Sequence, residues 1–220
     1  MSTKEQLRLW DDGLQAYRVG DLDAALEMFQ SVGDYSRINF NIAMIFCQTG
    51  DHASAVEMLT QSLSKDPFLA VAYFQRGYSE FMLGDYEMAE EDFTQAIELL
   101  RENDSIDYTQ LSLSFELRRS EVLHNRAMCA HQLGDMQAAT DDMNAAMTTA
   151  ANDHKMRLGT SMRSGITSLS LFAVPGSTLF EVAKSKIANL EKKSFLKDAK
   201  VLLSTDGEEK FSGFSGAAIL

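Results

Sequence analysis

The sequence predicts an all-α fold, a right-handed solenoid built from four helix pairs. The first observation is a Gly-Asp pair that occurs four times, beginning at residues 20, 50, 84 and 134. Glycine suits the left-handed position that ends a helix, so each pair marks the turn between two helices. The second observation is the pattern that follows each turn. Small and large apolar residues share one helix face, as in Tyr86, Ala89, Phe93 and Ala96.

The spacing of the Gly-Asp pairs predicts both the repeat type and an insertion. The successive intervals are 30, 34 and 50 residues. A period of about 34 residues is typical of tetratricopeptide repeats, in which each unit is a helix–turn–helix. The last interval is about 16 residues longer than that period. We therefore predict an insertion between repeats three and four, at about residues 102–116, whose turn-forming residues indicate a compact loop or a short hairpin.

The helices can be placed from the same patterns. Ser36 is expected to cap the third helix with its side chain. A further helix at residues 153–166 would cap the solenoid, so the repeat domain is expected to cover residues 1–167. The other helices are expected at Thr3–Arg18, Leu22–Gln30, His52–Ser64, Ala70–Leu83, Tyr86–Arg101, Leu117–Leu133 and Met136–Ala150.

The region after the repeats is expected to fold back onto them. Residues 168–180 read SLSLFAVPGSTLF and are too apolar for a free linker. We expect this stretch to run extended in the concave groove of the repeats, with Phe172 and Val174 substantially buried. A short polar helix at residues 181–193 would follow, which completes a groove-packing region at 168–193. Residues 194–220 form a last region that ends in a polar, glycine-rich, mobile tail.

Composition excludes several classes of function. The net charge is −12, with 20 Lys and Arg against 32 Asp and Glu, which argues against a nucleic-acid binder. There is no signal peptide and no apolar run of the length that spans a membrane, so a cytosolic, soluble chain is expected. The two cysteines are expected to be buried free thiols. No motif for catalysis, metal binding or a cofactor is present, so the protein is not predicted to be an enzyme.

Three stretches carry a family resemblance. The run AVAYFQRG, the insertion LRENDSIDYTQLSLSFELRRSEVLHN, and FLKDAKVLL followed by FSGF resemble the cytosolic activator subunits of superoxide-generating NADPH oxidases. The resemblance covers almost the whole chain. It implies a regulatory subunit that binds a GTP-loaded Rac-type small GTPase and activates superoxide production by a membrane flavocytochrome. It also implies other cytosolic oxidase subunits as partners, and a cytoplasmic protein that is recruited to membranes without being inserted.

The resemblance also implies which residues act. The GTPase-binding positions are Ser36, Asp66, Phe68, Arg101, Asn103, Ser105 and Asp107. At two of them this sequence departs from the phagocyte member of the family that it resembles, which has a histidine in place of Phe68 and a leucine in place of Ser105. The oxidase-activating segment matches Phe195–Thr205, and its apolar residues are Phe195, Leu196, Val201, Leu202 and Leu203. Within it, Lys197-Asp198 replaces a Gly-Lys pair.

Several of these residues also have simpler, structural interpretations. Arg101 could place a cation at a helix C-terminus, and Asp107 could be a turn residue that binds its own backbone. The lysines between residues 184 and 200 could form a solvated helix face or attract the chain to an anionic membrane surface. The alternative function is a generic tetratricopeptide adaptor that binds a peptide tail, as co-chaperones do. Asn125 and Arg126 are the residues that hint at the carboxylate clamp such an adaptor uses.

Overall fold

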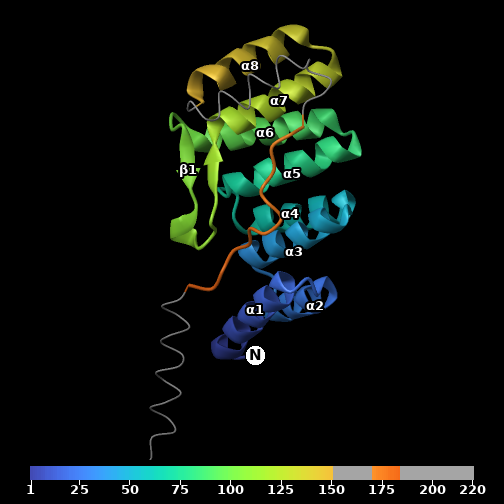
Figure 1. Ribbon diagram of the computed structural model, residues 1–220, viewed down its shortest axis with the longest axis vertical. Coiled ribbons are helices and arrows are strands. Elements are labelled where there is room, and N and C mark those ends of the chain that lie inside the picture. Colours follow the sequence, from blue (N-terminus) through green and yellow to red (C-terminus); the bar gives the residue numbers. More distant parts are fainter. Residues whose placement is uncertain (151–169, 184–220) are drawn as a thin grey trace, which may run out of the picture. The chain divides into compact units, whose positions relative to one another are not determined.

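The computed structural model describes residues 1–150 and 170–183. Within these ranges the chain forms four helix pairs that follow one another, which confirms the all-α prediction (Figure 1). The pairs are α1 (Thr3–Arg18) with α2 (Leu22–Val32), α3 (Ser36–Thr49) with α4 (His52–Lys65), α5 (Ala70–Leu83) with α6 (Tyr86–Leu100), and α7 (Arg119–Leu133) with α8 (Met136–Thr149). Among the helices in these two ranges, none combines the length and the apolar character that a membrane crossing requires.

The Gly-Asp pairs form the turns within each helix pair, as predicted. The glycine of each pair has a φ between 79° and 88°, in the left-handed region that glycine adopts without strain. The aspartates at positions 21, 51 and 135 then accept a hydrogen bond from a backbone N–H in the first turn of the next helix. Such a cap stabilises a helix by about 1 kcal/mol. The repeated dipeptide therefore encodes both the end of one helix and the start of the next.

Glycines inside two helices allow the members of a pair to approach closely. A Cβ atom at Gly77 would lie only 3.0 Å from Cε1 of Phe93 and 3.1 Å from the carbonyl oxygen of Ala89. Gly13 faces Phe29 in the first pair in the same way, with the added Cβ atom 2.8 Å from the ring. The close contact offsets the loss of about 1 kcal/mol in helix propensity that a mid-helix glycine brings.

The insertion is a short β-hairpin, one of the two forms expected for it. Strand β1 (Ser105–Asp107) pairs antiparallel with β2 (Glu116–Arg118), and the 3₁₀ turn η1 (Thr109–Leu111) lies between them. Tyr108 is buried at the end of β1, and its hydroxyl oxygen accepts a hydrogen bond of 3.0 Å from the N–H of Val71. The hairpin is thereby attached to the first turn of α5.

Ser36 does not cap α3, contrary to the prediction. It is the first residue of the helix itself, and Tyr35 occupies the cap position with an extended backbone and no side-chain cap bond. The Ser36 hydroxyl lies 3.1 Å from that of Ser62 on α4 instead. A helix cap has an extended backbone at its own position. Here the extended residue is Tyr35, one position before the predicted cap, Ser36.

Other boundaries also differ from the predictions. Helix α7 begins two residues late because Leu117 belongs to strand β2, and α6 ends at Leu100 because Arg101 leaves the helix with a φ of 54°. Glu181–Ala183, expected to begin a helix, are not helical, and the N–H of Glu181 is bonded to the carbonyl oxygen of Ser112. The capping helix predicted at 153–166 and the rest of the polar helix lie outside the described residues.

Candidate functional site

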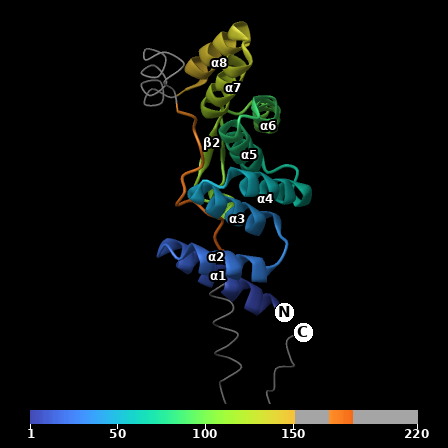
Figure 2. The same cartoon turned by 90° about the vertical axis from the view of Figure 1, so that its right-hand side faces the viewer.

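The groove of the repeats is filled by residues 170–183 of the same chain. This segment passes the first helix of every pair, in the order α7, α5, α3 and α1 (Figures 1 and 2). It therefore runs from the fourth repeat back to the first, antiparallel to the direction in which the repeats follow one another. The prediction of a self-filled groove is confirmed for the described part of the segment.

Side-chain amides of the repeats bind the main chain of this segment. Asn125 on α7 donates to the carbonyl oxygen of Phe172 at 2.7 Å and accepts from its N–H at 2.9 Å. Asn41 on α3 makes the same two bonds with Phe180, at 2.9 and 2.8 Å. Gln75 on α5 accepts from the N–H of Val174 at 3.0 Å. The groove thus satisfies the backbone of an extended strand, which would otherwise lose its bonds to water on burial.

The three amides could have been found in the sequence. Asn41, Gln75 and Asn125 each lie nine residues before the glycine of their own Gly-Asp pair, at positions 50, 84 and 134. They therefore occupy one structural position in three successive repeats. All three are buried, with exposed fractions of 0–1%. A buried side-chain amide needs a hydrogen-bond partner. Amides at the same position in three successive repeats therefore indicate that one segment binds all three.

The apolar anchors of the segment differ in part from those predicted. Val174 is buried as expected, whereas Phe172 is only half-buried. Phe172 lies against the ring of His124, with ring centroids 4.9 Å apart. Burial lowers the pKa of His124 to about 4, so its ring is neutral at physiological pH. The deepest anchor is Phe180, which is fully buried and was not among the predicted anchors.

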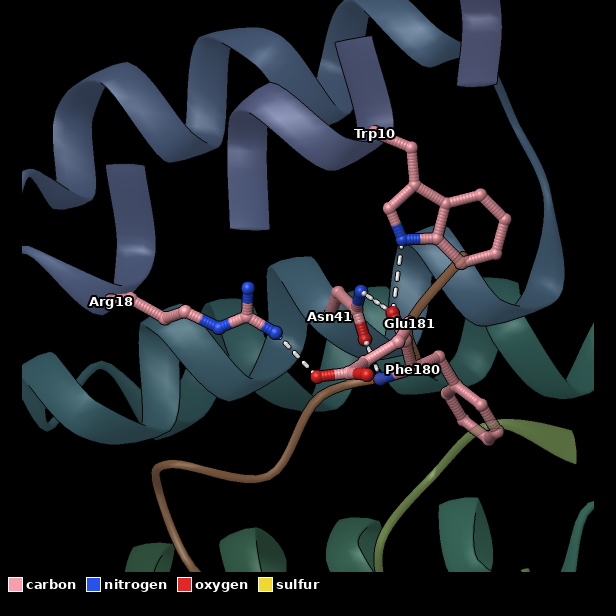
Figure 3. Close-up of polar contacts among 5 residues, drawn as sticks. All are labelled: Trp10, Arg18, Asn41, Phe180 and Glu181. Carbon is pink, nitrogen blue, oxygen red and sulfur yellow. Dashed lines mark hydrogen bonds and ion pairs between the residues drawn. The ribbon is translucent and has the colours of Figure 1, made fainter. Parts of the chain in front are cut away.

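Phe180 and Glu181 form a junction between distant parts of the chain (Figure 3). The carbonyl oxygen of Phe180 accepts bonds from Asn41 and from the indole N–H of Trp10, the latter at 2.9 Å. The carboxylate of Glu181 pairs with the guanidinium of Arg18 on α1. These two consecutive residues therefore contact the first two repeats together.

The predicted GTPase-binding residues lie along the hairpin edge, which we define as the hairpin, the residues between α6 and β1, the α4–α5 loop and the first turn of α3. Arg37, next to Ser36, donates a bond of 3.2 Å to the carbonyl oxygen of Leu111 at the hairpin tip. Tyr108, next to Asp107, bonds the start of α5, where the α4–α5 loop ends. Of the other candidates, Asp66 and Phe68 lie in that loop and Ser105 lies in β1. Arg101 and Asn103 lie between α6 and β1.

Most of these side chains are accessible. Phe68 is 78% exposed. Arg101, Asn103 and Asp107 are also exposed, whereas Ser36, Asp66 and Ser105 are half-buried. The structure thus places the candidates at one edge of the repeats and leaves four of the seven open to a partner.

Local bonds hold the backbone of this edge. Asp107 accepts from the N–H and the hydroxyl of Thr109, both at 2.9 Å, so it is a turn residue as the simpler interpretation states. Those bonds lower the pKa of its carboxyl group. Arg119 donates to the carbonyl oxygens of Arg101 and Asn103, which fixes the start of the insertion.

The carboxylate clamp of a peptide adaptor is not available. Asn125 is used by Phe172 of the groove segment. Arg126 donates two bonds of 2.7 Å to Asp142 on α8 and a third to Thr94 on α6. Both hints of a clamp are therefore accounted for by contacts within the chain. The apolar residues predicted to activate the oxidase, within 195–205, lie outside the described residues.

Comparison with known proteins agrees with the helix pairs. Residues 36–68, 70–103 and 120–153 each match a family model described as a tetratricopeptide repeat. Over 219 residues the chain is 34% identical to Neutrophil cytosol factor 2 of Mus musculus, and the alignment covers 98% of this chain and 42% of that one. It is 32% identical to NADPH oxidase activator 1 of Rattus norvegicus, covering 92% and 46%. The chain belongs to the tetratricopeptide-domain family of NADPH oxidase activators.

The chain spans less than half the length of those relatives. Solved structures resemble it in fold. YrrB, described as a tetratricopeptide protein with an unusual peptide-binding site, matches with a TM-score of 0.58 at 11% identity, covering 74% of this chain and 76% of YrrB. MamA matches with a TM-score of 0.55 at 12% identity, covering 77% and 80%. At these identities the likeness concerns the arrangement of the helix pairs alone.

Proposed function

We propose that this chain is a non-enzymatic regulatory subunit that binds a GTP-loaded Rac-type small GTPase and activates superoxide production by a membrane NADPH oxidase. On this proposal it is a cytoplasmic protein that reaches the membrane through its partners. Those partners are the GTPase, the flavocytochrome and other cytosolic oxidase subunits. Membership of the activator family supports the oxidase half of the proposal, because two of the relatives are named as NADPH oxidase activators.

The proposed GTPase docking site rests on one observation: the groove is occupied by the chain itself, whereas the hairpin edge is exposed. The groove, where repeat proteins of this kind bind peptides, is filled by residues 170–183. The hairpin edge instead presents exposed polar side chains on a backbone that Arg119 and Tyr108 hold. Exposed polar side chains around one exposed aromatic side chain, that of Phe68, match the composition of protein–protein interfaces. A peptide adaptor would need its groove open, so the filled groove favours the GTPase over a peptide tail.

Arg101 is the residue whose change tests the docking site. Arg101→Glu is expected to weaken binding of the GTP-loaded GTPase by about 2–5 kcal/mol, because truncating or reversing a charged contact at an interface leaves its partner unpaired. The measurement is titration calorimetry with the GTPase in its GTP and GDP forms. Arg8→Glu, the same reversal at an exposed position of α1, is the control and should bind as the parent does. Equal affinities of Arg101→Glu and the parent would remove the insertion from the docking site.

A change at Val201 tests the proposal that residues 195–205 activate the oxidase. The segment Phe195–Thr205 carries three adjacent apolar residues beside lysines, a composition suited to a partner at an anionic membrane surface. Val201→Ala is expected to reduce superoxide output in a reconstituted membrane assay several-fold, with GTPase affinity unchanged. Val19→Ala, at an exposed valine of the first repeat, is the matched control. Full activation by Val201→Ala would mean that the activating contact lies elsewhere.

A further inference from the structure

The groove segment and the hairpin edge are joined by one backbone hydrogen bond. The N–H of Glu181 donates to the carbonyl oxygen of Ser112 at 2.8 Å. Ser112 ends the 3₁₀ turn at the hairpin tip, and the preceding carbonyl, that of Leu111, accepts from Arg37 on α3. Two consecutive carbonyls of the tip are therefore held, one by the second repeat and one by the segment that fills the groove.

The hairpin tip depends on such outside support. Ser112 has a φ of 64° and a ψ of 35°, a left-handed conformation that residues other than glycine rarely adopt. Backbone of this kind persists where the surroundings hold it in place. A hairpin of two three-residue strands is also marginal by itself. Part of that support comes from the Glu181 bond.

The segment delivers this bond from a fixed position. Phe180 is held by two bonds to Asn41 and one to Trp10, and its ring packs edge-on against Phe40 with centroids 5.1 Å apart. The guanidinium of Arg37 lies 5.6 Å from the centre of the same ring. Arg37 thus contacts both Phe180 and the hairpin tip. The N–H of the next residue, Glu181, can therefore move little relative to Ser112.

We infer that Phe180 and Glu181 position the hairpin tip, so that filling of the groove and the ability of the hairpin edge to bind its partner are coupled. This inference rests on the proposed function only for the identity of that partner. Coupling of this kind is reciprocal, so a partner on the hairpin edge should in turn strengthen the hold on the groove segment. The element with two arrangements is the tip, bonded to Glu181 or released from it. Phe180 and Glu181 are positioning residues, since neither belongs to the GTPase-binding set.

The first test needs no partner. Glu181→Pro removes the donor N–H, whereas Glu181→Ala keeps it and removes only the carboxylate. Backbone hydrogen exchange of residues 108–115 is expected to be about tenfold faster in Glu181→Pro, the ratio that one hydrogen bond of ordinary net strength supplies. Glu181→Ala should exchange as the parent does. Equal exchange in Glu181→Pro and the parent would overturn the coupling.

A second pair of variants tests the coupling without proline, which could itself distort the backbone next to it. Asn41→Leu removes both bonds to Phe180, and Asn125→Leu removes the equivalent two bonds to Phe172 at the other end of the segment. Faster exchange at 108–115 is expected in Asn41→Leu alone. If both variants accelerate it equally, the tip responds to general loosening of the segment, and the specific role of the junction is wrong.

GTPase-binding measurements on the same variants test the coupling and the proposed partner separately. Affinity for the GTP-loaded GTPase is expected to fall about tenfold in Glu181→Pro, matching the exchange ratio, and to stay at the parent value in Glu181→Ala. If the parent binds no GTPase while the exchange results hold, the proposed partner is wrong and the coupling stands. If the parent binds and Glu181→Pro binds equally well, the coupling fails and the docking proposal stands.

Discussion

Phe180→Ala is expected to destabilise the folded chain by about 3–5 kcal/mol, the range for a fully buried phenylalanine. The ring has no exposed surface and fills the space beside Phe40 at the junction. The loss of stability cannot exceed the free energy with which residues 170–183 bind the groove. A larger loss would instead release the segment from the groove. The measurement is urea unfolding followed by circular dichroism.

The same variant has a spectroscopic signature. Trp10 is the single tryptophan of the chain, and its indole N–H bonds the carbonyl oxygen of Phe180. If the segment leaves the groove, the emission of Trp10 should shift to the red and become more accessible to quenchers. Phe172→Ala is the matched control, since Phe172 is half-buried and lies at the other end of the segment. A Phe180→Ala protein with the parent's stability and emission would show that the segment is held without this ring.

Arg76→Met is expected to cost about 3–5 kcal/mol, because it leaves the buried carboxylate of Asp92 without its cation. Arg76 on α5 donates two bonds of 2.7 Å to Asp92 on α6 and one of 3.0 Å to Thr60 on α4. Glu80 lies 3.8 Å from the same guanidinium. The side chains of Asp92 and Glu80 are only 5% and 6% exposed. The guanidinium therefore joins two successive repeats around two buried acids.

The cost of Arg76→Met should grow with pH. Burial, with the nearby Asp92 carboxylate, raises the pKa of Glu80 to about 8, and burial also raises that of Asp92. A carboxyl whose pKa is higher in the folded state binds more protons there, so stability falls as pH rises from the ordinary carboxyl range to about 8. At pH 5 the variant can neutralise its acids by protonation, and at pH 9 it cannot. Unfolding free energies at the two pH values measure the difference.

The fourth repeat supplies a matched control for this prediction. Arg126 makes the same two bonds of 2.7 Å to Asp142, but Asp142 is 14% exposed. Arg126→Met should therefore cost less than Arg76→Met. Arg76→Met combined with Asp92→Leu should recover part of the loss, since it removes a buried charge together with its partner. An Arg76→Met protein as stable as the parent at pH 9 would mean that water already solvates these acids.

Functional residues were predictable to different degrees. The candidate residues of the hairpin edge come from the resemblance and remain predictions; four of the seven lie in or beside the insertion, a contiguous stretch with its own sequence. Asn41, Gln75 and Asn125 were missed as a set, although their shared place nine residues before each glycine was visible. Helix boundaries failed by one or two residues at Ser36 and Leu117, where the competing choices differ by a single cap or strand bond.

The sequence by itself determined the four helix pairs, the turns between their members and the position of the insertion. These depend on glycine, aspartate and apolar periodicity, whose effects act within a few residues along the chain. The tertiary structure alone decided that Phe180, and not Phe172, is the main anchor, and that Glu181 meets Ser112. Trp10 and Phe180 are 170 residues apart. The groove binds the segment largely through backbone N–H and carbonyl groups, which every residue but proline carries alike, so no local pattern marks which residue each amide will meet.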